Sequence, residues 1–215
     1  MKRRDFSLVC AGAVAAGSWP LAGQAQVMVP QAGQDYRALD KPAPVDAPAG
    51  RIEVVEFFSY MCPHCNAFEP VFEAWTKRVP KDVVVRRAPV AFMPDYAVLQ
   101  RLYFTLEAMG LVDKLHVKVF AAVHVERKRF DKPETAAAWA AQQGVDRAKF
   151  LEQFNSFSVA SKATRATQLM NAYQVDGVPA LGVAGRFYTD GTMARSMERT
   201  LQVVEYLVAD VRKGR

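Results

Sequence analysis

Two cysteines stand three positions apart in the tetrapeptide Cys62-Pro63-His64-Cys65. Residues at this spacing lie on the same edge of a helix, so the two sulfurs can close or open a disulfide. If a helix begins at Cys62, its unpaired backbone N–H groups and positive dipole end favour a thiolate there. His64 adds a nearby group that can carry positive charge. Because a thiolate attacks and leaves more readily than a thiol, the tetrapeptide predicts thiol–disulfide exchange.

The alternatives for this pair are a structural disulfide and half of a zinc site. A bridge across so short a loop removes little chain entropy, so it would stabilise the fold poorly. Structural zinc needs four ligands, but the chain after residue 25 has no second cysteine pair and only His116 and His124 as further histidines. We therefore expect redox chemistry at Cys62 and Cys65, with no metal and no cofactor.

The segments around the pair have the order strand, turn, helix, strand. Residues 52–58 form a short, nearly continuous apolar run that is typical of a buried strand. After Cys65 the apolar residues follow in steps of three and four, which predicts a helix, and Pro70 should kink it. A second strand is predicted over residues 83–90, so the whole segment forms a βαβ unit.

Residues 95–174 have the periodicity of helices, and strands are predicted again after residue 174. Asp146 is predicted to cap a helix inside this block. A β-hairpin around Ala184-Gly185 and a last amphipathic helix over residues 197–211 complete the order βαβ, helical block, ββα. Three aromatic residues of the helical block are predicted to belong to its core: Phe150, Phe154 and Phe157.

The residues from Glu56 to Cys65, together with Gly177-Val178-Pro179-Ala180, resemble the DsbA family of thioredoxin-fold oxidases. The resemblance covers nearly all of the chain after residue 25. It implies an α/β thioredoxin fold with an inserted α-helical domain. The expected parts are a linker and irregular lead-in over 26–50, a thioredoxin-like domain over 51–94 and 175–213, and a helical insertion over 95–174.

The resemblance also implies roles for matching positions. Cys62 would be the exposed nucleophile, and Cys65 the buried cysteine that resolves a mixed disulfide. Pro179 matches a cis-proline that faces the pair, and the backbone of Val178 would help to hold a substrate segment. Glu56 matches a buried acid that handles a proton for the resolving thiol. Its place in an apolar strand agrees with burial and a raised pKa, although a carboxylate facing solvent at a strand edge is an alternative.

Four further positions have weaker signals. Arg87 lies where the family often has a lysine near the acid, and Met61 replaces an aromatic residue often found before the first cysteine. His116 and His124 have the spacing of packed helix residues. We expect no catalytic role for either histidine.

Residues 1–25 have the pattern of a cleaved signal peptide. Lys2-Arg3-Arg4 precedes a mostly apolar run from Phe6 to Ala22, which is too short to span a bilayer, and small residues follow as a cleavage site. The start also resembles a twin-arginine signal, but paired arginines are common in basic starts, so the export route stays open. We therefore expect a periplasmic protein.

Loss of residues 1–25 would remove the third cysteine, Cys10, and lower the formal net charge from +6 to +4. The basic residues are scattered and accompany no recognition motif, so we expect no nucleic-acid partner.

The resemblance implies an oxidase that donates its disulfide to reduced or unfolded exported proteins and is reoxidised by a membrane quinone-linked partner resembling DsbB. The alternatives are a disulfide isomerase or reductase and, from another class, a thioredoxin-fold chaperone or metal-binding module. Periplasmic isomerases usually carry an added dimerisation domain, for which residues 26–50 leave no room. Val178, where isomerases often have threonine, also favours an oxidase. We expect a monomer.

Overall fold

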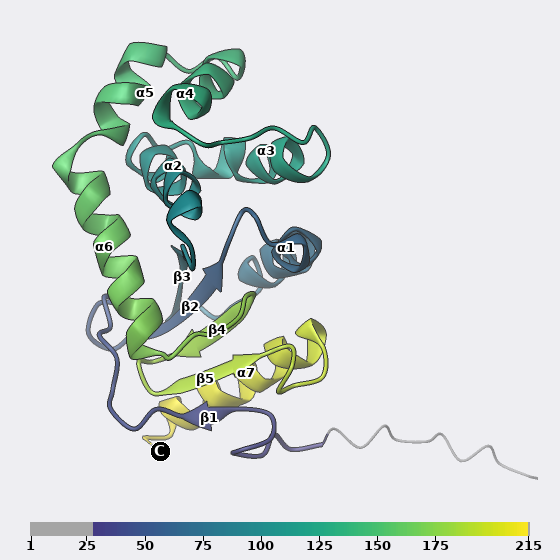
Figure 1. The fold of residues 1–215 in the computed structure, drawn as a ribbon. Coiled ribbons are helices and arrows are strands. Elements are labelled where there is room, and N and C mark those ends of the chain that lie inside the picture. Colours follow the sequence, from purple (N-terminus) through teal and green to yellow (C-terminus); the bar gives the residue numbers. More distant parts are fainter. Residues whose placement is uncertain (1–27, 215) are drawn as a thin grey trace, which may run out of the picture.

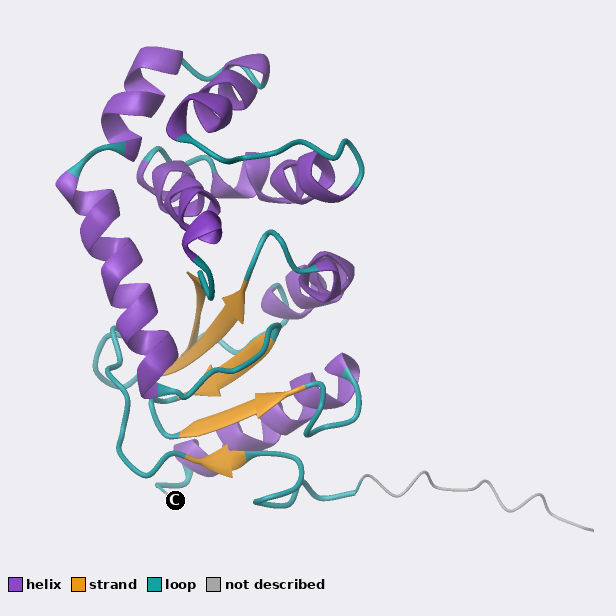
Figure 2. Ribbon diagram, viewed as in Figure 1, coloured by secondary structure: helices purple, strands orange, loops and turns teal. Residues whose placement is uncertain are grey.

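The computed structural model describes residues 28–214 (Figures 1 and 2). The predicted signal peptide, residues 1–25, lies outside the described residues. Within 28–214, no helix is both long enough and apolar enough to cross a membrane.

A five-stranded sheet forms the centre of the fold, with the strand order β1-β5-β4-β2-β3. β2 pairs in parallel with β3 and antiparallel with β4, and β5 pairs antiparallel with β4 and β1. This arrangement confirms the predicted α/β thioredoxin-like fold. The strands are β1 Arg37–Ala38, β2 Ile52–Phe58, β3 Val83–Pro89, β4 Ala180–Val183 and β5 Phe187–Asp190.

The short strand β1 differs from the expected irregular lead-in. Arg37 and Ala38 pair with Tyr188 and Phe187 of β5. A two-residue strand is too short to show a period-2 pattern, and its hydrogen-bond partners come from the far end of the sequence. No local pattern of residues therefore predicts this strand.

Two helices cover one face of the sheet, and a third covers the other. α1 (Pro63–Thr76) and α7 (Met197–Arg212) pack their apolar residues against β2, β4 and β5. The C-terminal part of α6 (Phe157–Ala172) packs on the opposite face. In Figure 1, α7 lies along the lower part of the sheet, while α6 rises from the sheet into the helical block.

Five α-helices lie between β3 and β4 in the chain, after the short 3₁₀ turn Pro94–Tyr96. Besides α6 they are α2 Ala97–Ala108, α3 Val112–His124, α4 Pro133–Gln142 and α5 Arg147–Phe154. Asp146 caps α5 as predicted, because its side chain accepts a hydrogen bond from the Lys149 N–H at 2.9 Å.

The prediction for Phe157 is wrong. Phe150 and Phe154 are buried, whereas the side chain of Phe157 is 87% exposed. α5 ends at Phe154, and Ser156 caps a new helix in which Phe157 is the first residue. The apolar face of α5 therefore cannot be extrapolated across this cap, because the helix axis changes direction there.

The turn that carries the cysteines packs on the helical block. Phe58, Tyr60 and Cys65 belong to the same buried cluster as the apolar residues of α2 to α6. The end of β2 and the start of α1 therefore lie at the junction between the sheet and the helical block (Figure 1).

Candidate active site

Cys62 caps the N-terminus of α1. Its backbone is extended, and its Sγ accepts a hydrogen bond from the Cys65 N–H at 3.4 Å. Pro63 occupies the first helical turn, where a missing N–H breaks no helical bond. The structure shows both cysteines as free thiols, with Cys62 partly exposed and Cys65 buried.

The two thiols have opposite pKa shifts. The pKa of Cys62 is lowered to about 6, chiefly by a hydrogen bond from the Cys65 thiol and further by the backbone N–H groups of Cys65 and His64 and the charge of His64; partial burial opposes them. The pKa of Cys65 is raised, first by burial and then by its contact with Cys62. Near neutral pH the pair therefore holds one thiolate and one thiol.

The segment before β4 faces the first cysteine. The peptide bond between Val178 and Pro179 is cis, in agreement with the prediction. The Sγ of Cys62 lies 3.2 Å from the carbonyl oxygen of Val178, to which its thiol form donates a hydrogen bond. The structure thus brings together the tetrapeptide and the Val-Pro pair that the sequence singled out.

Glu56 lies in the middle of β2 and is fully buried, so the solvent-facing alternative is excluded. Burial raises the pKa of Glu56 to about 8, although Arg87 lowers it. Its Oε2 accepts a hydrogen bond from Arg87 Nε at 3.1 Å. Within residues 28–214, Oε1 has no hydrogen-bond partner. This oxygen is therefore free to carry the proton of the neutral acid.

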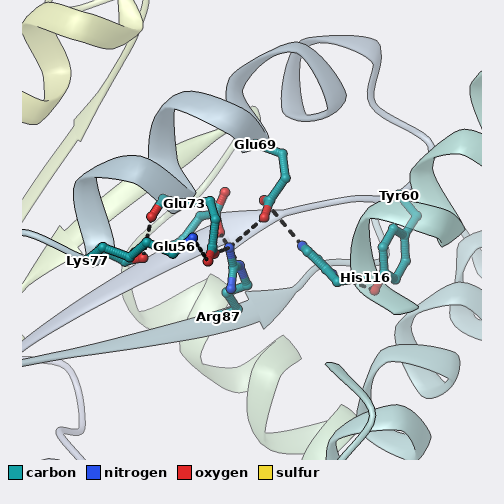
Figure 3. Close-up of polar contacts among 8 residues, drawn as sticks. Glu56, Tyr60, Glu69, Glu73, Lys77, Arg87 and His116 are labelled. Atoms are coloured by element: carbon teal, nitrogen blue, oxygen red, sulfur yellow. Dashed lines mark hydrogen bonds and ion pairs between the residues drawn. The ribbon is translucent and has the colours of Figure 1, made fainter. Parts of the chain in front are cut away.

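Arg87 stands beside Glu56 because the register of the parallel pair β2·β3 places the two residues opposite one another. The guanidinium is shared among the carboxyl groups of three glutamates (Figure 3). Besides Glu56 it binds Glu69 Oε1 at 2.7 Å and Glu73 Oε2 at 3.4 Å, both on α1. The expected position of Arg87 near the acid is thus confirmed.

The two remaining histidines of the sequence make contacts that the sequence analysis missed. His116, on α3, is buried as predicted, but its Nδ1 lies 2.7 Å from the Tyr60 hydroxyl and its Nε2 lies 3.2 Å from Glu69 Oε2. The Nε2 of His124 lies 2.9 Å from the backbone carbonyl oxygen of Tyr60. α3 therefore holds Tyr60 at both its side chain and its backbone.

Among residues 28–214, no group of three or more His, Cys, Asp or Glu residues could hold a metal ion. The chemistry of the site is that of a dithiol at a helix N-terminus, with a buried acid behind it and a Val-cis-Pro segment in front of it. These features define a thioredoxin-fold thiol–disulfide oxidoreductase.

The model of the DSBA-like thioredoxin domain family matches residues 53–202. The thiol:disulfide interchange protein DsbA of Bordetella parapertussis is 44% identical over 214 residues, which cover 99% of this chain and 100% of that protein. The crystal structure of Pseudomonas aeruginosa DsbA matches with a TM-score of 0.82 at 41% identity, over 86% of this chain and 95% of that one. The crystal structure of DsbA from Xylella fastidiosa matches with a TM-score of 0.80 at 31% identity, over 86% of this chain and 99% of that one. The chain belongs to the DsbA family.

Proposed function

We propose that this protein is an oxidase that donates the Cys62–Cys65 disulfide to reduced or unfolded exported proteins in the periplasm. The observation that carries the proposal is the position of Cys62 at the N-cap of α1, partly exposed and bound by the Cys65 N–H, with Cys65 buried behind it. This geometry lowers the pKa of Cys62 to about 6 and raises that of Cys65. A stabilised Cys62 thiolate favours the reduced pair, so the disulfide is a strong oxidant.

The reaction begins on the oxidised pair. A substrate thiolate attacks the Cys62 sulfur, the bond between Cys62 and Cys65 breaks, and a mixed disulfide forms. Cys65 leaves with the electron pair and takes a proton. Glu56 can supply this proton because its pKa of about 8 keeps it protonated near neutral pH, and it is reprotonated from solvent.

A second substrate thiolate then attacks the substrate sulfur of the mixed disulfide. The Cys62 sulfur leaves as a thiolate, which the start of α1 stabilises. The substrate has lost two electrons and gained a disulfide, and the pair is reduced. The backbone of Val178, with Pro179, holds the substrate segment in extended form beside Cys62.

Renewed turnover requires an oxidant for the pair, for which we propose a membrane quinone-linked partner resembling DsbB.

Residues 1–25 supply the export signal, and the protein acts as a monomer. The thioredoxin-like domain comprises residues 51–94 and 175–213, with the helical insertion of residues 95–174 between them.

The test is the equilibrium constant of the Cys62–Cys65 pair against glutathione, combined with refolding of a reduced, disulfide-containing substrate. An oxidase gives a pair that glutathione reduces readily, and the oxidised protein restores activity to the reduced substrate stoichiometrically. A pair that glutathione barely reduces would contradict the proposal and indicate a reductase. Cys62→Ser is the control, because an enzyme loses all transfer when its attacked sulfur is removed.

A further inference from the structure

A chain of buried polar contacts connects the active-site turn to the acid behind the cysteines by way of the helical block (Figure 3). The Tyr60 hydroxyl contacts His116, and His116 contacts one carboxylate oxygen of Glu69. The other oxygen of Glu69 accepts a hydrogen bond from Arg87, which also binds Glu56. Only His116 comes from the helical insertion, on α3.

The hydrogen bonds of this chain have a definite direction. Burial raises the pKa of Tyr60 well above its usual value, so the phenol keeps its proton and its O–H donates a hydrogen bond to His116 Nδ1. Burial also lowers the pKa of His116, against the opposing effect of Glu69, so the imidazole is neutral. With Nδ1 as acceptor, the single ring hydrogen is on Nε2 and is donated to Glu69.

Glu69 depends on this donor. The residue is 3% exposed, and its Oε1 is bound by Arg87 while its Oε2 is bound by His116. Removing the His116 N–H leaves one oxygen of a buried carboxylate without that partner, which disfavours the negative charge at this position. The charge of Glu69 acts in turn on Glu56, because a like charge nearby opposes ionisation.

We propose that His116 is a positioning residue that the helical block contributes to the dithiol site. It holds the Glu69 carboxylate beside Arg87 and so fixes how the guanidinium is shared between Glu69 and Glu56. Among the hydrogen bonds of residues 28–214, none joins His116 to a cysteine sulfur, so we assign its influence on Cys65 to the route through Glu69, Arg87 and Glu56. The inference rests on the proposed role of Glu56 as proton donor to Cys65.

The direction of the effect on the pKa of Glu56 follows from the charged groups that act on this residue. When the charge of Glu69 is disfavoured, a cause that raises the pKa of Glu56 is weakened, while Arg87 remains to lower it. Loss of the His116 N–H therefore lowers the pKa of Glu56. The groups facing His116 are Tyr60 from the turn, Glu69 and Glu73 from α1, Arg87 from β3 and Tyr103 from α2.

The experiment compares two substitutions of similar length at one position. His116→Gln keeps an N–H that can reach Glu69, whereas His116→Met fills the space without a donor. The carboxyl ¹³C shift of Glu56, assigned with Glu56→Gln, is followed against pH in the reduced protein. We expect a midpoint of about 8 for the parent protein and the Gln variant. For the Met variant we expect a midpoint lower by about one pH unit.

Two further variants serve as references. Glu69→Gln removes the charge outright and should lower the Glu56 midpoint in the same direction. Tyr60→Phe removes the hydroxyl at the far end of the chain but leaves the contact between His116 and Glu69, so the midpoint should stay at the parent value. Equal midpoints for the Met and Gln variants, or a shift in Tyr60→Phe as large as in the Met variant, would overturn the proposal.

If the Met variant does not fold, His116→Leu, which also lacks a donor, takes its place. The proposal then requires a lowered Glu56 midpoint in His116→Leu and the parent midpoint in His116→Gln, and equal midpoints contradict it. Because the titration uses no substrate, its failure leaves the proposed oxidase function standing. Conversely, a pair that proves to be reducing would not change the expected midpoints.

Discussion

The Sγ of Cys62 lies 3.2 Å from the carbonyl oxygen of Val178, a residue 116 positions further along the chain. The sheet explains this approach. β2 and β4 pair antiparallel, with Phe57 opposite Ala180. The C-terminal end of β2 and the N-terminal end of β4 therefore lie side by side at the same end of the sheet. The turn after β2 carries Cys62, and the segment before β4 carries Val178. A substrate sulfur bonded to Cys62 would therefore lie near this carbonyl group.

The first prediction concerns the Cys62 thiolate. In the reduced protein, its ultraviolet absorbance should titrate with a midpoint of about 6. The hydrogen bond from the Cys65 thiol is the largest cause of this low pKa, so Cys65→Ala should raise the midpoint more than His64→Ala does. Cys62→Ser, the control, should show no transition near pH 6. A midpoint close to the ordinary thiol value of 9.0 would refute the assignment.

The second prediction concerns the stability of the two redox forms. Because the folded pKa of Cys62 lies below its value of 9.0 in an ordinary environment, ionisation stabilises the folded reduced protein. This stabilisation is complete above pH 9, decreases as the pH falls, and is lost below pH 6. The oxidised protein has no such titration, and its short disulfide loop contributes little. Urea unfolding should therefore show the reduced form to be the more stable one at pH 8.

Urea unfolding of both redox forms at pH 5 provides the control for that prediction. There the thiolate contribution has vanished, so the advantage of the reduced form should disappear. An oxidised form that is more stable at both pH values would indicate a reductase.

The parts of the site that the sequence predicted either have a local signal or, like Val178 and Pro179, match the family resemblance. The tetrapeptide from Cys62 to Cys65 is contiguous, and the switch from a period of two to a period of about 3.6 places it between β2 and α1. Glu56 was identified by the family resemblance, with which its position in an apolar strand agrees. Its pairing with Arg87 then follows from the strand register, which the sequence alone does not fix.

The polar contacts of α3 could not be predicted in this way. His116 lies 56 positions from Tyr60 and 47 from Glu69. Helical spacing shows which face of α3 the histidine occupies, but not which segment packs on that face. A usable signal was present nonetheless, because the buried hydroxyl of Tyr60 needs a partner and the sequence has only three histidines.

The third prediction concerns the pH dependence of the free energy of unfolding that arises from Glu56. Its folded pKa of about 8 lies above the ordinary value of 4.5, so its contribution is fully present below pH 4.5 and is lost as the pH rises through 8. Glu56→Gln does not titrate. Relative to the parent protein it should therefore gain stability between pH 5 and pH 9, by up to about 4 kcal/mol.

Urea unfolding of the oxidised forms at both pH values measures this gain, because the Cys62 thiol is then absent and cannot titrate. A difference between variant and parent that stays constant with pH would show that Glu56 is ionised throughout. The proposed proton transfer to Cys65 would then be wrong.

The last prediction concerns Pro179, which follows the carbonyl that contacts Cys62. Proline presents no backbone N–H beside the sulfur, whereas Pro179→Thr adds a donor there and alters the edge on which a substrate segment pairs. The helix start that activates Cys62 belongs to a different segment and remains intact. Attack on the disulfide should therefore proceed while release of the substrate slows, so covalent complexes should accumulate on non-reducing gels. Pro80→Thr, an exposed proline before β3, is the matched control and should trap none. If Pro179→Thr traps none either and refolds a reduced substrate at the parent rate, the substrate segment does not bind at Val178.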